Sequence, residues 1–357
     1  MSAANRNVVL SSTQRTRLEA MVRGPIEVDP VVEAPLTVPS FTTSILVVLQ
    51  MLIAMLREVA VDVSAIHLIG GAATHVVCPK INHADYDIEV SVQMQGNEDQ
   101  EMFAAILNVC FKMIRELSGS DCHFNYVANK FVHPERLWSL ISLNNKSGKT
   151  LDLKFVAHPS RSYQFSIDSL VIGLLPIVEG IDGEIDISSK FSDVEIVISH
   201  IQQKIIDTRD PQTIYLGGLM KLVVLQQRGF IIQKPKNEKK NMLNKITTRF
   251  LIDYENAMED VIEMDDTFDQ TNPLWKFLKN HLGDVETTTD NSKKAVILQK
   301  YEEYLRTMKR TITESRANER QISRKMFVLK LEMMAEVFRR EREAIPFAVS
   351  EDDFPRL

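Results

Sequence analysis

The sequence predicts an α+β protein in which a mixed sheet with flanking helices is followed by a helical C-terminal domain. Three observations support this prediction. Residues 86–94 alternate apolar and polar side chains, which is typical of a half-buried strand. Residues 102–117 carry apolar side chains at helical spacing. From about residue 196 onward the apolar pattern becomes helical.

The composition is that of a globular protein large enough for two domains. The chain has 357 residues, of which 44% are hydrophobic and 25% charged, and its net charge is −6. This acidic total argues against a DNA-coating protein, although it leaves room for a local basic groove. The cysteine spacings match no zinc pattern, so we expect free thiols in a reducing compartment. We expect a cytoplasmic protein, with the nucleus as a second location. The cysteines are Cys78, Cys110 and Cys122.

Residues 1–38 are expected to form an extended segment that packs on the core, with one helix around residues 12–22. The start of the chain lacks the apolar core of a signal peptide. Residues 45–56 are the most apolar run, but a bilayer span needs roughly 20 apolar residues. We therefore expect a buried helix there, capped by Ser40 or Thr43, and no membrane span.

The sheet domain is expected over residues 39–195 and the helical domain over residues 196–343, followed by a mobile tail at 344–357. A short apolar strand at 66–69 leads into two glycines and a helix start. The later strands are expected at 86–94, 138–143 and 150–156, with a strand or buried segment at 165–178 and loops at 234–240 and 283–294. The expected helices of the second domain are 195–207, 218–228, 242–253, 274–281, 295–313 and 319–342.

Three aspartates form the candidate metal site. Asp85 and Asp87 are two residues apart at the start of a strand, and this spacing puts both carboxylates on one face of the sheet. Asp152 alternates with Leu151 and Leu153 and therefore faces away from the apolar side of its strand. Three neighbouring carboxylates repel one another unless cations bind them. Mg²⁺ prefers oxygen ligands, and two such ions about 3.5–4 Å apart activate a hydroxyl and stabilise the leaving oxygen.

Gly70 and Gly71 form the candidate phosphate site. Without Cβ atoms the backbone approaches a triphosphate closely, and the following helix start offers free N–H donors. A D-x-D pair or a Gly-Gly turn alone is a weak signal. The order of strand, Gly-Gly turn, D-x-D strand, helix, hairpin and a further acid is more specific, and it favours a catalytic site.

Several stretches of the chain match a known family in the same order. They are LIGGAATHV, DYDIEV, LWSLISLNNKSGKTLDLKFV, SYQFSIDSL, KIIDTRDP, LGGLMKLVVLQQRGF and TRFLIDY. The matching stretches cover roughly residues 12–340, and the segments LWSLISLNN and GGLMK with RGF are the most specific. In these motifs the chain resembles the terminal nucleotidyltransferase 5 family of noncanonical poly(A) polymerases, within the polymerase-beta nucleotidyltransferase superfamily.

This resemblance implies a nucleotidyltransferase fold, with a catalytic domain over residues 39–195, and a reaction. The family adds AMP units from ATP to the 3′ end of single-stranded RNA, which implies ATP binding, RNA binding and mRNA stabilisation. Its D-x-D pair and later acid bind two Mg²⁺ ions, with Mn²⁺ as an alternative. Carried over, the catalytic and metal-binding residues are Asp85, Asp87 and Asp152, and the nucleotide-binding residues are Gly70 and Gly71.

Three positions depart from the family pattern. Gly71 stands where the family usually has a serine whose hydroxyl contacts the triphosphate; a hydrogen bond to a charged group contributes about 1.5–3 kcal/mol. Asp152 stands where the family commonly has glutamate. Glu89 stands where the family has an apolar residue, and we expect its side chain to point to solvent beyond the site.

Two alternatives to the polymerase hypothesis stay open at this point. A catalytically weak or inactive member of the family would act as an RNA-regulatory binding protein, and Gly71 favours this alternative. An enzyme with another acceptor or another nucleotide is the third hypothesis. Oligomeric state, RNA targets and protein partners leave no signal in the sequence.

Weaker candidates lie in the helical domain. The resemblance indicates that Lys221, at a helix start after Gly217 and Gly218, meets the nucleotide phosphates; the alternative is a surface lysine. Three arginines recur every four residues on one helical face and could hold RNA phosphates. The alternative for these arginines is a solvated face with ion pairs to nearby glutamates. They are Arg316, Arg320 and Arg324.

Overall fold

A computed structural model gives the fold of the chain as two compact units, Met1–Gln202 and Gln203–Leu357. The structure describes residues 8–31, 38–83, 85–94, 99–121, 123–133, 137–146, 149–157, 165–214, 216–259, 272–315 and 322–345. The division falls after helix α6 (Val194–Gln202), whereas the sequence places it at residue 195, inside that helix. Each unit is described by itself.

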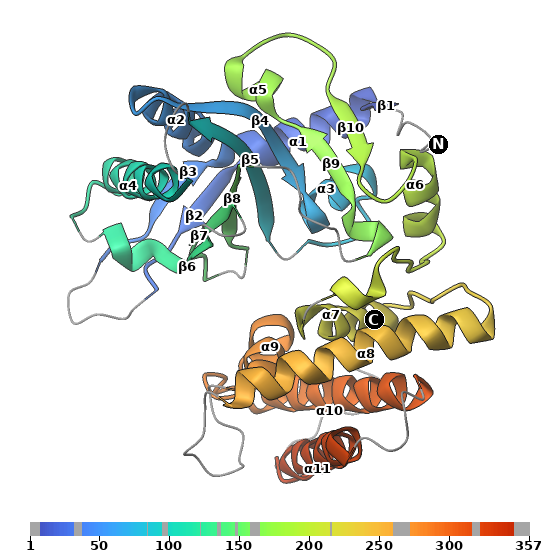
Figure 1. Ribbon diagram of the computed structural model, residues 1–357. Helices are drawn as coiled ribbons and strands as arrows, with labels where there is room; N and C mark the ends of the chain where they lie inside the picture. Colours follow the sequence, from blue (N-terminus) through green and yellow to red (C-terminus); the bar gives the residue numbers. More distant parts are fainter. Residues whose placement is uncertain are drawn as a thin grey trace. The chain divides into compact units, whose positions relative to one another are not determined.

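The first unit is built on an eight-stranded sheet with the order β1-β10-β9-β4-β5-β8-β7-β6 (Figure 1). Strands β5 and β8 run parallel, and the other described neighbours in this sheet are antiparallel. This mixed sheet, with its helices, confirms the predicted α+β class. The strands are β1 (Val8–Val9), β4 (Val61–Ile69), β5 (Tyr86–Met94), β6 (Val127–His133), β7 (Trp138–Leu143), β8 (Leu151–Val156), β9 (Leu170–Gly173) and β10 (Asp186–Ser189).

Alternation along β5 and β8 separates an apolar face from a polar face. Ile88, Val90 and Leu153 are fully buried. On the same side of the sheet lie α2 (Ile45–Glu58) and α4 (Asp99–Ser118), which pack on each other and on β4, β5 and β7. The opposite face of the two strands is therefore left for polar side chains, and this is the face that carries the candidate site.

The apolar run at residues 45–56 forms α2 and is buried, as expected. The helix begins at Ile45, after both predicted caps, because residues 41–44 form strand β3 (Phe41–Ser44). This strand pairs with β2 (Pro25–Val28). The cap is therefore Ser44, whose hydroxyl accepts from Val47 N at 3.2 Å, and not Ser40 or Thr43. Among the described helices, none is both long and apolar enough to cross a membrane.

The N-terminal segment contributes a helix and two short strands to the first unit. Helix α1 (Ser12–Arg23) begins with a capping box between Ser11 and Gln14 and buries Leu18 and Val22 completely. The segment at 165–178, expected as a strand or a buried stretch, forms β9 and then α5 (Leu175–Glu179). Cys78 and Cys110 are free thiols, and Cys122 lies outside the described residues.

The second unit is helical. Figure 1 shows α10 between α8 and α11, and α10 also packs on α7 and α9. Tyr301, Tyr304 and Phe250 are its largest fully buried side chains. The predicted tail at 344–357 falls outside the described residues beyond residue 345. The helices are α7 (Leu216–Gln227), α8 (Lys236–Glu259), α9 (Pro273–Leu282), α10 (Asn291–Glu314) and α11 (Ile322–Glu343).

The predicted loop at residues 234–240 is wrong for residues 236–240, because α8 begins at Lys236. Lysine and glutamate have good helix propensity, and a solvated first turn needs no apolar side chain. Glu238 in that turn also complements the helix dipole.

Candidate active site

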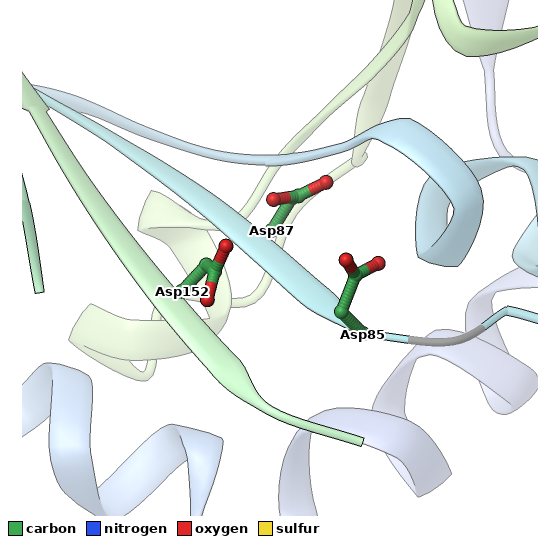
Figure 2. A group of neighbouring side chains, drawn as sticks. All are labelled: Asp85, Asp87 and Asp152. Carbon is green, nitrogen blue, oxygen red and sulfur yellow. The ribbon is translucent and has the colours of Figure 1, made fainter. Parts of the chain in front are cut away.

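Asp85, Asp87 and Asp152, here called the carboxylate triad, meet on the polar face of the sheet. Asp85 directly precedes β5, Asp87 lies in β5, and Asp152 is the register partner of Asp87 on the parallel strand β8. One carboxylate oxygen from each lies within 4.8 Å of the others, and all three residues are half-buried. Figure 2 shows the three side chains converging from these two segments. The structure thus brings together the three predicted metal ligands.

The triad fits a divalent metal ion. Its donors are carboxylate oxygens, which are the ligands that Mg²⁺ and Mn²⁺ prefer. The three oxygens are close enough for shared coordination. One of the carboxylates already holds a cation of the protein itself, since the Lys154 ammonium donates a hydrogen bond to Asp87 Oδ1. This bond shows that the concentrated negative charge draws a positive group to the site.

A second ion pair lies beside the triad on the same face. Glu89 is 1% exposed, and Lys190 Nζ donates to its Oε1 and Oε2 at 3.1 Å each. The expectation that Glu89 points to solvent is therefore wrong. A buried carboxylate needs a paired cation, and Lys190, which directly follows β10, supplies it.

His67 lies beside the Glu89–Lys190 ion pair. Its Nδ1 lies 3.9 Å from Glu89 Oε1. Burial lowers the pKa of His67 and outweighs the Glu89 carboxylate, which raises it, while Lys190 lowers it further. The Glu89 carboxylate therefore has Lys190 as its ion-pair partner, and the lowered pKa of His67 favours the neutral imidazole.

Gly70 and Gly71 lie against the triad at the start of α3 (Gly70–Val77). Gly70 has φ +69°, and a Cβ at that position would lie 2.7 Å from Asp87 Oδ2, so glycine is required there. A Cβ at Gly71 would meet only ordinary contacts, the nearest being His83 Cβ at 3.5 Å. The turn is anchored by Thr74, whose hydroxyl donates to Gly70 O at 3.1 Å and to Ile167 O at 2.6 Å.

Two histidines and a tyrosine flank the turn. The His83 ring lies 4.9 Å from the His75 ring and 5.0 Å from the Tyr86 ring, centroid to centroid. Burial lowers the pKa of His83 to about 4, with smaller contributions from Lys149 and His75. His75 Nδ1 donates to Ile81 O at 2.7 Å. These rings pack the loop that leads into Asp85.

The weaker candidates lie apart from this group in the chain. Lys221 is half-buried on α7 of the second unit. Arg316 and Arg320 lie outside the described residues, as does the side chain of Arg324 on α11. Their roles in nucleotide and RNA binding stay predictions.

Two residues of the site were missed from the sequence, Lys154 and Lys190. Lys154 is two residues after Asp152, so the same period-two argument that placed Asp152 on the polar face also places Lys154 there. Lys190 is 101 residues from its partner Glu89, and no local pattern connects them.

The fold and the carboxylate triad are those expected of the nucleotidyltransferase class. Residues 10–334 match the family model described as nucleotidyltransferase, and the chain belongs to that family. The expected resemblance to the terminal nucleotidyltransferase 5 proteins is confirmed. The chain is 27% identical over 299 residues to terminal nucleotidyltransferase 5B of Rattus norvegicus, a match that covers 78% of this chain and 66% of the relative. It is 30% identical over 236 residues to terminal nucleotidyltransferase 5D of Homo sapiens, covering 59% of this chain and 57% of the relative.

The chain thus spans 66% and 57% of the length of these two relatives, less than two thirds in each case. Among solved structures, a tRNA-processing enzyme is similar with a TM-score of 0.34 and 15% sequence identity, covering 81% of this chain and 80% of the other. A likeness at this level supports no conclusion about substrate.

Proposed function

We propose that this protein is an RNA adenylyltransferase, a noncanonical poly(A) polymerase that adds AMP from ATP to RNA 3′ ends with two divalent ions. The observation that carries the proposal is the carboxylate triad, whose oxygens lie within 4.8 Å of one another beside the Gly70–Gly71 turn. The similarity to proteins named terminal nucleotidyltransferases supports it.

In the proposed reaction the RNA 3′-hydroxyl oxygen attacks the α-phosphorus of ATP. A bond forms between these two atoms, the bond from the α-phosphorus to the bridging oxygen of the β-phosphate breaks, and pyrophosphate leaves. Bound Mg²⁺ ions, or Mn²⁺, would lower the pKa of the hydroxyl and neutralise charge on the phosphates. Asp85 and Asp87 would hold both ions, and Asp152 would hold one of them and accept the hydroxyl proton at its carboxylate.

The Gly70–Gly71 turn and the start of α3 would bind the triphosphate. The residue before the helix, Ile69, has no polar side chain to cap it, so the N–H groups of the first turn can donate to phosphate oxygens. Catalysis would then depend mainly on positioning and on charge stabilisation. Lys221 and the three arginines of the second unit are proposed to contact the triphosphate and the RNA.

A primer-extension assay tests this proposal. The purified chain is incubated with a labelled oligo(A) primer, Mg²⁺ and each nucleoside triphosphate in turn. Extension with ATP that is lost in the double variant Asp85→Asn/Asp87→Asn is the expected result. Asp62→Asn is a matched control, because Asp62 is an exposed acid at the far end of β4, where its register partner is Gln93.

Two results would change the assignment. Extension with UTP alone would replace the adenylyl specificity. A wild-type chain that extends no primer with any nucleotide would contradict the proposed polymerase activity. It would leave the second candidate, a weak or inactive family member that binds and regulates RNA, which Gly71 favours because it lacks the serine hydroxyl of the family. Action on mRNA in the cytoplasm or nucleus is part of the proposal.

A further inference from the structure

Lys154 is a buried cation placed directly on a metal ligand. Its side chain is 10% exposed, and its Nζ donates to Asp87 Oδ1. A buried ammonium requires a paired anion. The triad carries three formal negative charges and Lys154 carries one positive charge, so the group as it stands has a formal charge of −2.

The register of β5 and β8 sets Lys154 between two carboxylates. Glu89 is the register partner of Lys154, and Asp87 is the register partner of Asp152. Residues two apart on a strand are separated by roughly 6.6 Å. Lys154 lies opposite Glu89 in the register, yet its ammonium donates to Asp87, two residues earlier on β5. The flexible four-carbon side chain of lysine allows either of these two carboxylates to be the acceptor.

Glu89 has capacity for a second cation. An ionised carboxylate offers about four lone-pair sites, and Lys190 uses one at each oxygen. Its burial strengthens any ion pair that forms there, because the local dielectric is low.

A divalent ion and the Lys154 ammonium cannot both bind the Asp87 carboxylate at full strength. Two cations held by the same carboxylate repel each other, and the repulsion is stronger where solvent screening is weak. A divalent ion at Asp87 would therefore weaken or break the bond from the Lys154 ammonium, and the energy of that bond would be subtracted from the binding energy of the ion.

We propose that Lys154 competes with the metal ion for Asp87 and that Glu89 receives the displaced ammonium. By holding Asp87, Lys154 lowers the metal affinity of the triad. By accepting the displaced ammonium, Glu89 makes this loss of affinity smaller. This inference rests on the metal-binding part of the proposed function, and it makes Lys154 and Glu89 positioning residues that act through Asp87.

Direct Mn²⁺ binding to the full chain, measured by electron paramagnetic resonance without nucleotide or RNA, tests the competition. Lys154→Met keeps the length of the side chain and removes its charge, so the dissociation constant is expected to fall about tenfold, the factor for roughly 1.4 kcal/mol. Lys149→Met is the matched control, because Lys149 is an exposed lysine close in sequence to β8. Its effect is expected to stay below about twofold, since solvent screens an exposed charge.

A double-mutant cycle tests the role of Glu89. Glu89→Gln removes the anionic acceptor, so Mn²⁺ is expected to bind about threefold more weakly than in the wild type, corresponding to roughly 0.65 kcal/mol. In the Lys154→Met background the same change is expected to weaken Mn²⁺ binding less, because no ammonium remains to be received and only the loss of the Glu89 charge acts. Equal effects in the two backgrounds would contradict the role assigned to Glu89.

Further outcomes separate this inference from the polymerase proposal. Unchanged or weaker Mn²⁺ binding by Lys154→Met, or equal gains in Lys154→Met and Lys149→Met, would overturn the competition even in an active polymerase. Triad-dependent Mn²⁺ binding that tightens in Lys154→Met, without primer extension, would support the competition and sink the polymerase claim. Should Lys154→Met not fold, Lys154→Arg replaces it: a guanidinium holds a carboxylate at least as firmly, so tighter metal binding by that variant overturns the competition.

Discussion

The neighbouring glycines Gly70 and Gly71 at the start of α3 have different reasons to be glycine. Gly70 combines a positive φ of +69° with a Cβ position 2.7 Å from Asp87 Oδ2. Gly71 has room for a side chain, because the nearest atom to its Cβ position is His83 Cβ at 3.5 Å. The serine that the resemblance leads us to expect at position 71 would therefore fit there without a steric clash.

Gly71→Ser is expected to raise kcat/KM for ATP in primer extension. The new hydroxyl can donate to a triphosphate oxygen, and a hydrogen bond to a charged group contributes about 1.5–3 kcal/mol, or about 10- to 150-fold. Gly70→Ser is the comparison, and it is expected to lose activity because its Cβ displaces the Asp87 carboxylate. Equal kcat/KM for Gly71→Ser and the wild type would show that the hydroxyl has no partner in this turn.

His83 is expected to make the fold acid-sensitive. Its pKa is about 4 in the folded chain against 6.5 for an ordinary histidine. Between these values the unfolded chain binds more protons, so the free energy of unfolding falls as the pH drops from about 6.5 to about 4. The loss is reduced by solvent screening, because the ring is only half-buried.

Urea unfolding at several pH values across this window measures the effect, with His83→Phe as the variant. Phenylalanine keeps an aromatic ring beside His75 and Tyr86 but does not titrate. Its unfolding free energy is expected to depend less steeply on pH than that of the wild type. Parallel pH profiles for the two proteins would assign the acid sensitivity to other groups.

Some features of the candidate site could be predicted from the sequence, and others could not. The triad was predictable because period two fixes the face of each aspartate, and the parallel pairing of β5 and β8 then places Asp87 beside Asp152. The burial of Glu89 was not predictable, because it depends on Lys190, which follows β10 and which tertiary folding brings to Glu89 from 101 residues away in the sequence.

At the scale of elements, helices and strands with a strong apolar pattern were predicted from the sequence, and those with a weak pattern were not. Helix α2 and strand β5 have continuous patterns and were predicted within a few residues. Strand β6 was not predicted, because it lies at the edge of the sheet and its described residues are half-buried or exposed. An edge strand is stabilised by backbone hydrogen bonds to β7, and these leave no trace in side-chain hydrophobicity.

Helix α11 offers two adjacent methionines with opposite environments. Met333 is 66% exposed and Met334 is 4% exposed. Met334→Ala is expected to cost about 2–5 kcal/mol of unfolding free energy, because it leaves a cavity. Met333→Ala is expected to stay within about 0.5 kcal/mol of the wild type, as exposed substitutions do. Urea unfolding followed by circular dichroism compares them, and similar costs for both would mean that α11 presents a different face to its core.

At the scale of the whole molecule, the two-unit organisation follows from the change from mixed to helical patterning, but the position of the boundary does not. Helix α6 has a helical pattern like those that follow it, yet it packs on β10 and on the short 3₁₀ turn Ser166–Asp168 of the first unit. Val197 and Ile201 are buried there. Periodicity shows that a helix has an apolar face and does not show which core that face joins.

Metal binding is expected to stabilise the first unit selectively, because the carboxylate triad lies entirely within it. A ligand at 100 times its dissociation constant adds about 2.7 kcal/mol to the stability of the part of the chain that binds it. The chain carries two tryptophans, one in each unit: Trp138 in β7 and Trp275 in α9. Trp275→Phe leaves a reporter of the first unit, and Trp138→Phe leaves a reporter of the second.

Urea unfolding of these two variants, followed by tryptophan fluorescence with and without saturating Mg²⁺, measures the selectivity. The midpoint reported by Trp138 is expected to rise with Mg²⁺, and the rise should vanish when Asp85→Asn/Asp87→Asn is added. The midpoint reported by Trp275 is expected not to move, because none of the triad ligands belongs to its unit. Equal shifts of both midpoints would mean that the units unfold as one cooperative body, so that a metal ion at the triad stabilises the helical unit as well.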